Sequence, residues 1–179
     1  MESRSCKLLE CLRRFYKDEN NLNNLLNVVQ NEAHSNTISL RLLDWLVSNY
    51  AKAYNIIYYV DGLPFNMHQN YKNMLKAYSK KMFDPFRRHA RIYIPYTVDN
   101  RKVMLETTVA QLMFFKWAIE NQVIQYAHNN RVSIKYHMDM NTKHRIYTNK
   151  IPTKTKRSEL SKPKMSVNMY RVNITVTFA

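Results

Sequence analysis

The sequence contains a single glycine, Gly62, among its 179 residues. The GxxxxGK phosphate loop and the GxGxxG turn of dinucleotide-binding folds each need several glycines, because the backbone must approach the phosphate closely. Neither motif can be written with one glycine. P-loop nucleotide hydrolysis and Rossmann-type cofactor binding are therefore excluded, and we expect no cofactor.

Cysteines and long apolar runs are also scarce. The two cysteines, Cys6 and Cys11, lie five residues apart on a predicted helix, where their side chains do not face each other. We therefore expect reduced thiols and an intracellular protein. No stretch approaches 18 consecutive apolar residues, and the charged first turns do not resemble a signal peptide, so no membrane span is predicted.

Acidic residues are few: 13 Asp and Glu stand against 28 Lys and Arg, for a net charge of +15. Such a field attracts polyanions, of which nucleic acid is the commonest, although an acidic protein surface or anionic lipid would also serve. The carboxylates are scattered, whereas metal-dependent nucleases need them clustered. His137, Asp139 and His144 have a spacing that fits no standard metal site, so we expect no metal.

One residue pattern resembles a catalytic site. The order of residue types in tyrosine recombinases can be traced through Arg87, Arg88, His128, Arg131 and either Tyr147 or Tyr170. It is a short HxxR pattern in a chain rich in arginine and tyrosine, and the residues around it lack the helical context of that family. The sequence therefore favours a non-enzymatic protein with no catalytic residues.

Apolar residues at helical spacing predict several helices. They cover residues 5–30 with an interruption at 18–21, residues 38–52 after an N-cap at Thr37, residues 67–81, and residues 109–126. Thr108 and Gln111 match a capping box for the last of these helices, which we expect at the centre of the core.

Alternating or β-branched runs predict strands at residues 55–60, at 91–96 and 102–106 as a hairpin, and at 170–178. We expect a single α+β domain over residues 1–179. In it, three or four helices pack on one small antiparallel sheet, built from the strands near residues 56, 92, 104 and 172.

A basic stretch precedes the last predicted strand. Residues 135–164 hold nine Lys or Arg, two acids, two prolines and few large apolar groups. This composition predicts a long basic loop at residues 140–165, mobile until a partner binds it. Its candidate nucleic-acid contacts are Lys150, Lys154, Lys156, Arg157, Lys162 and Lys164.

A second basic cluster surrounds the stretch "SKKMFDPFRRH" at residues 79–89. Its candidate phosphate contacts are Lys76, Lys80, Lys81, Arg87, Arg88 and Arg91. Pro85 stiffens the turn between Phe83 and Phe86. These rings either stack on unpaired bases or fill an ordinary core corner, in which Asp84 caps the chain or pairs with an arginine. Phe83 extends the apolar stripe of the preceding helix and is expected in the core, whereas Phe86 is expected to be the exposed, base-contacting ring.

Several segments carry a family resemblance: "TISLRLLDWLVSNYAKAYNI", "LKAYSKKMFDPFRRHARI", "ETTVAQLMFFKWAIENQVIQY", and "RSELSK" before the alternating end. Over nearly the whole chain they resemble an uncharacterised protein family of nucleocytoplasmic large DNA viruses. The resemblance implies no assigned activity, and it implies the cytoplasm of an infected host (the viral factory) or the virion as the setting. The family pattern has a cysteine where this chain has Arg87, which argues against thiol chemistry there.

The sequence thus predicts a non-enzymatic nucleic-acid-binding protein of a large DNA virus, acting in replication, transcription or packaging. Its expected partners are DNA or RNA, with other viral proteins as further candidates. The alternative is a structural virion protein, a minor capsid or core component that docks on other proteins through its basic loop. Neither the type of nucleic acid nor its strandedness can be read from the sequence.

Overall fold

The structure is a computed structural model that describes residues 4–30, 38–98 and 101–150. The chain divides into two compact units, residues 1–142 and 143–179. The fold below is that of the first unit. Of the second unit, only the backbone of residues 143–150 is described.

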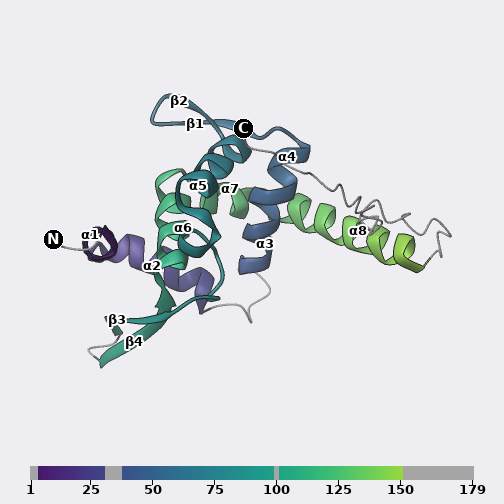
Figure 1. Cartoon of the computed structure of the whole chain (residues 1–179). Coiled ribbons are helices and arrows are strands. Elements are labelled where there is room, and N and C mark those ends of the chain that lie inside the picture. The colour runs from purple at the N-terminus through teal and green to yellow at the C-terminus, as the bar shows by residue number, and fades with distance from the viewer. Residues whose placement is uncertain (1–3, 31–37, 99–100, 151–179) are drawn as a thin grey trace, which may run out of the picture. The chain divides into compact units, whose positions relative to one another are not determined.

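Helices dominate the described part of the chain (Figure 1). They are α1 (Arg4–Phe15), α2 (Glu19–Val29), α3 (Leu40–Trp45), α4 (Ala51–Ala53), α5 (Met67–Met82), α6 (Val109–Glu120), α7 (Val123–Asn129) and α8 (Arg131–Lys150), with a π-helical segment η1 (Leu46–Tyr50) between α3 and α4. The strands are β1 (Ile57–Val60), β2 (Leu63–Asn66), β3 (Arg91–Val98) and β4 (Arg101–Thr108). The predicted α+β class is confirmed, with more helical segments than the three or four expected.

Helix α6 forms the centre of the core, as predicted. Leu112, Phe114, Phe115 and Ala118 are fully buried, and α1, α2, α5, α7 and β4 all contact this helix. A helix that is apolar all round is stable in water only when neighbours cover every side. The remaining elements are therefore arranged around α6.

The predicted helix 109–126 is shorter than expected. It ends at Glu120, and Gln122 adopts a left-handed backbone conformation with φ 55° before α7 begins. The backbone N–H groups of Asn121 and Gln122 donate to carbonyls of the last turn of α6, which closes that helix. The apolar periodicity runs on through the break because α7 is buried as well.

Side-chain caps define several helix starts. Asp18 accepts from the backbone N–H groups of Asn20 and Asn21 and separates α1 from α2, as the predicted interruption requires. Ser39 caps α3 by accepting from Leu42 N at 3.2 Å. The predicted N-cap, Thr37, lies outside the described residues, and the observed start is two residues later.

Among the described residues, the two hairpins do not join into the single predicted sheet. There, β1 pairs with β2 and β3 pairs with β4, each antiparallel, and the two pairs form separate sheets. Asp61 and Gly62 adopt positive φ in the β1–β2 turn, which suits a tight hairpin. Each hairpin satisfies its own hydrogen bonds locally, and the 16-residue helix α5 separates the two along the chain. The predicted strand near residue 172 lies outside the described residues.

Part of the predicted basic loop is helical. Residues 140–150 belong to α8, not to a loop. No proline or glycine occurs between Arg131 and Lys150, and Ile134 is fully buried, so packing supports a helix that the charge pattern concealed. Residues 151–165 of the predicted loop lie outside the described residues. Within the described ranges, no helix is both long and apolar enough to cross a membrane.

Alkaline pH should destabilise this fold. Burial raises the pKa of Tyr16 and Tyr58, and it raises the pKa of Tyr71 to about 12. An unfolded tyrosine has a pKa of about 10, so the stabilising contribution of each protonated ring is complete below that pH and is lost as the pH rises toward the folded-state pKa. The free energy of unfolding, measured by urea titration, should therefore fall between pH 9 and 11.

Tyr16→Phe isolates one of these groups. The Tyr16 hydroxyl donates to the Leu112 carbonyl at 2.8 Å. Its loss should cost about 1 kcal/mol at pH 7 and make the alkaline decline shallower. Tyr59→Phe, at a residue that is 73% exposed, is the control and should change neither quantity. An alkaline decline in Tyr16→Phe as steep as that of the wild type would contradict this account.

Candidate nucleic-acid interface

The end of α5 presents exposed lysines. Lys76, Lys80 and Lys81 are all exposed, and none of them forms an ion pair with another described residue. Ser79, with φ 56°, interrupts the helical backbone just before Lys80. His89 Nε2 donates to the Lys80 carbonyl at 3.0 Å, which ties the following loop to the end of this helix.

Phe83 lies in the core, as predicted. Its side chain is 1% exposed. Its ring centroid lies 5.4 Å from that of Phe114, 5.5 Å from Trp117 and 5.9 Å from Tyr71. These contacts explain why the ring is unavailable to a base and why the turn after α5 is fixed to α6.

Buried hydrogen bonds of the Gln111 side chain fix the turn after α5. Gln111, fully buried, donates from Nε2 to the Pro85 carbonyl at 2.8 Å and accepts from Thr107 Oγ1 at 2.9 Å. Thr108 Oγ1 accepts from Gln111 N at 3.1 Å, which is the first of the two hydrogen bonds of the predicted capping box. The Gln111 side chain does not make the second bond, back to the Thr108 backbone, but reaches the turn after α5. The sequence did not predict this contact of Gln111, because it depends on the packing of the turn against α6.

Asp84 has the structural role that we considered for it. It is 5% exposed, accepts from Phe86 N at 3.1 Å and pairs with Arg88 Nε at 3.5 Å. Phe86 is half-buried instead of exposed, and the Arg88 guanidinium lies 4.6 Å from its ring centroid. Because the core covers one part of this ring and an arginine covers another, a stacked base would have to displace Arg88.

The remaining arginines line the start of the β3–β4 hairpin. Arg91 Nε pairs with Glu106 Oε1 at 3.3 Å, and Arg87 Nη1 donates to the Glu106 carbonyl at 3.4 Å. Both arginines are exposed, and surface pairs of this kind are weak. A guanidinium has five N–H donors, so each arginine keeps donors for a phosphate.

Carboxylates below this surface offset part of its charge. Burial raises the pKa of Asp44, and the nearby Asp84 raises it further, while Arg88 and Lys80 lower it. Asp84 is buried, Asp44 is half-buried, and Glu106 is a surface residue whose side chain is 44% exposed. We call the exposed cations Lys76, Lys80, Lys81, Arg87, Arg88 and Arg91, on the end of α5, the turn after it and the start of β3, the basic corner. These six cations outnumber the three carboxylates.

The other predicted contacts cannot be placed on this surface. Lys150 is the last residue of α8, and nothing is described of its side chain. The others, Lys154, Lys156, Arg157, Lys162 and Lys164, lie outside the described residues. Sequence analysis also overlooked Tyr93, which is 58% exposed on β3. The alternation in "RIYIPY" could have revealed it, since Arg91 and Tyr93 share the face opposite Ile92 and Ile94.

His137 has an aromatic environment, not that of a metal ligand. The Trp45 indole donates to His137 Nδ1 at 3.0 Å, and the rings of Tyr50 and Tyr54 lie 5.4 Å away. These contacts pack α8 against α3, η1 and the end of α4. Among the described residues, no group of three potential ligands could hold a metal ion.

Comparison with known proteins places the chain among viral sequences. The family model DUF7197, described as a family of unknown function, matches residues 2–177. An uncharacterized protein of Acanthamoeba polyphaga mimivirus is 36% identical over 125 residues, which are 66% of this chain and 47% of that relative. The chain thus spans about half the length of the curated relative that it matches. No solved structure matches it.

The two phenylalanines should differ in their contribution to stability. Phe83→Ala leaves a cavity among three aromatic rings and should lower the free energy of unfolding by about 3–5 kcal/mol. Phe86→Ala should cost clearly less, because that ring is only half-buried. Urea unfolding of both variants at pH 7 measures the difference, and equal costs would contradict the burial described above.

Asp44→Asn should stabilise the protein at neutral pH. Because the folded state raises the pKa of Asp44, the group's stabilising contribution is complete below the unfolded pKa and is lost as the pH rises through the folded pKa. The variant should unfold at higher urea concentration than the wild type at pH 7, and at the same concentration near pH 3. Asp139→Asn, at an exposed position on α8, is the control; a destabilised Asp44→Asn at pH 7 would refute the assignment.

Proposed function

The chain belongs to the family of unknown function DUF7197 and shares ancestry with a mimivirus protein, and on that premise we propose that it is a non-enzymatic nucleic-acid-binding protein. The resemblance to an uncharacterised giant-virus family, predicted from the sequence, is confirmed by these matches. Binding itself is a proposal from the arrangement of charge. Its setting would be replication, transcription or packaging, in the infected host cytoplasm or in the virion.

The basic corner is the observation that carries the proposal. Lys76, Lys80, Lys81 and Arg87 are exposed and lack an ion-pair partner among the described residues. Lysine and arginine contacts to phosphates supply most of the affinity in sequence-independent binding. The hydrogen bond from Gln111 and the buried Phe83 fix the backbone of the turn that carries Arg87 and Arg88, so this backbone needs no ordering when a phosphate chain binds.

An ordinary solvated surface accounts for only part of this arrangement. Cations in the last turn of a helix interact favourably with the helix dipole, which explains Lys80 and Lys81. The helix dipole does not account for Arg87 and Arg91, which lie beyond the helix; each has one contact with Glu106 and keeps further donors exposed on the same positive surface. Such a cluster of like charges is favourable when a polyanion neutralises it.

A specific observation favours the second candidate, a structural virion protein. The β1–β2 hairpin exposes large apolar side chains: Ile57 is 54% exposed, Leu63 70% and Tyr59 73%. Exposed apolar groups gathered on one short hairpin are typical of protein-docking surfaces. On this alternative, the hairpin binds another viral protein, and the basic residues contribute to solubility.

Salt-dependent binding tests the first candidate. Fluorescence anisotropy with labelled single- and double-stranded DNA and RNA should give affinities that fall linearly on a log–log plot against salt, because bound counterions are released. The double variant Lys81→Gln, Arg87→Gln should lower the slope by about two units. The control Lys52→Gln, Lys135→Gln removes the same charge from exposed positions on α4 and α8 and should leave the slope nearly unchanged.

Two outcomes would overturn the proposal. If the wild type binds no nucleic acid at low salt, the protein-docking candidate replaces it. If both double variants reduce the slope equally, binding is a diffuse effect of net charge, and the basic corner is not the interface.

A further inference from the structure

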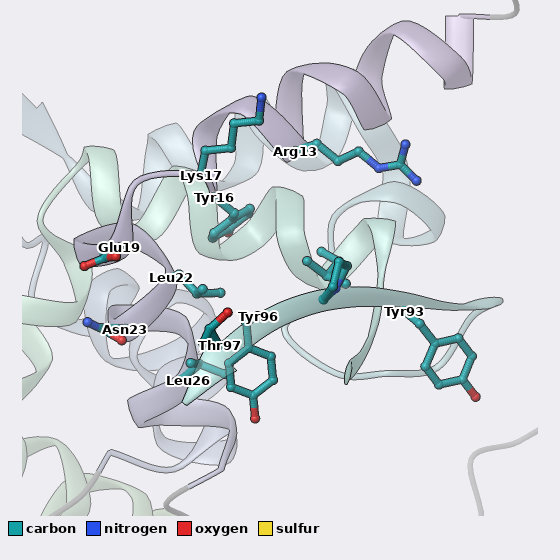
Figure 2. A pocket seen from close by; sticks show the side chains of 12 residues that line it. Arg13, Tyr16, Lys17, Glu19, Leu22, Asn23, Leu26, Tyr93, Tyr96 and Thr97 are labelled. Atoms are coloured by element: carbon teal, nitrogen blue, oxygen red, sulfur yellow. The ribbon is translucent and has the colours of Figure 1, made fainter. Parts of the chain in front are cut away.

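A groove of about 660 Å³ opens between the first two helices and β3 (Figure 2). Residues 13–26 of α1 and α2 form one wall, and residues 93–97 of β3 form the other. None of the residues that line it was among the nucleic-acid contacts predicted from the sequence. The groove joins segments that are some seventy residues apart in the chain.

The interior of the groove is held by hydrogen bonds within the protein. Gln30 Nε2 donates to the Tyr96 hydroxyl at 2.6 Å, and the Tyr16 hydroxyl donates to the Leu112 carbonyl at 2.8 Å. Both tyrosines are buried. Leu22 and Leu26 of α2 and Ile94 of β3 supply an apolar lining. The groove is thus preformed, and its deep polar groups already have partners.

The rim carries charges that suit an anionic chain. Arg13 on α1 and Lys17 in the turn between α1 and α2 both line the groove on its helical side (Figure 2). Both are exposed, and neither forms an ion pair with another described residue. Glu19 is the acidic residue among those that line the groove. It lies in the first turn of α2, where a carboxylate interacts favourably with the helix dipole.

Tyr93, which is 58% exposed, lines one end of the groove, and Figure 2 shows its ring directed away from α1 into solvent. No aromatic or cationic side chain in the described part of the chain covers it. It shares a face of β3 with Arg91, two residues away, because side chains on a strand alternate. Arg91 belongs to the basic corner, so the corner and the groove are neighbours along one strand.

We propose that this groove binds a single-stranded nucleic acid, with an unpaired base stacked on Tyr93 and adjacent phosphates contacted by Arg13 and Lys17. The inference rests on the proposed nucleic-acid binding and adds strandedness to it. Only an unpaired base offers a free face to an aromatic ring, whereas a duplex covers both faces of every internal base. An apolar groove with two cations on its rim and an exposed tyrosine at its end combines the features that single-strand sites use.

Substitutions of Tyr93 test the stacking contact. Tyr93→Ala should weaken binding of a labelled oligothymidine strand about five- to a hundred-fold and leave a duplex of equal length almost unaffected. Tyr93→Phe keeps the ring and should retain single-strand affinity. Tyr59→Ala removes a more exposed tyrosine from the other hairpin, at 73% exposure, and serves as the matched control with no expected change.

The rim is tested separately. The double variant Arg13→Gln, Lys17→Gln should lower the log–log salt slope for the single strand by about two units. This measurement tests the phosphate contacts of the groove even if Tyr93→Ala fails to fold.

Unchanged single-strand affinity in Tyr93→Ala, or equal losses for strand and duplex, would refute single-strand binding in the groove and leave the basic corner as the candidate interface. Absence of binding by the wild type would instead overturn the proposed function.

Discussion

Burial of the apolar faces of α6 is the constraint from which the rest of the structure follows. These faces need neighbours, and specific polar contacts fix several of those neighbours to the helix. The hydroxyl of Tyr16, the residue that follows α1, donates to the Leu112 carbonyl. The Trp117 indole attaches α5 by donating to Asn70 Oδ1 at 2.7 Å. Gln111 attaches the turn after α5 through the Pro85 carbonyl.

Both candidate contact surfaces depend on that helix. The basic corner is fixed where the α5 turn packs on the start of α6, and β4 runs directly into the N-cap of α6 at Thr108. The groove is bounded by α1 and α2, which contact α6, and by the partner strand of β4. The packed core thus fixes the backbone that carries these mutually repelling charges. This lowers the entropy that is lost when the charges bind a phosphate chain.

Acidic and basic side chains of the basic corner differ in burial. Asp84 is buried and Asp44 is half-buried, whereas the lysines and arginines of the corner are exposed. The buried Asp84 pairs with Arg88, whose guanidinium lies over the Phe86 ring. The same acids prevent full use of the formal charge, so the strength of the corner rests on the lysines and on Arg87. The chain belongs to a family of unknown function with a mimivirus relative, so the physical chemistry of these surfaces is the guide to function.

Local patterns in the sequence determined the positions of most elements. These patterns are helical spacing, the caps at Asp18 and Thr108, and the Asp61–Gly62 turn. Each depends on residues close together in the chain, so its effect can be predicted from the sequence. The core positions of Phe83 and α6 followed from the same spacing. The loop predicted at residues 140–165 was wrong over residues 140–150, because charge concealed a helix that packing of Ile134 and His137 supports.

Only the tertiary structure decided which charges are paired, which rings are covered and which surfaces meet. Arg88 covers Phe86 because Asp84 is buried beside it, and Gln111 reaches the Pro85 carbonyl across 26 positions of the chain. Tyr93 lines the same groove as Arg13 and Lys17 because α1 and β4 both pack against α6. Such contacts join segments far apart in the chain, and no spacing rule encodes them, because their energy arises only when the core has formed.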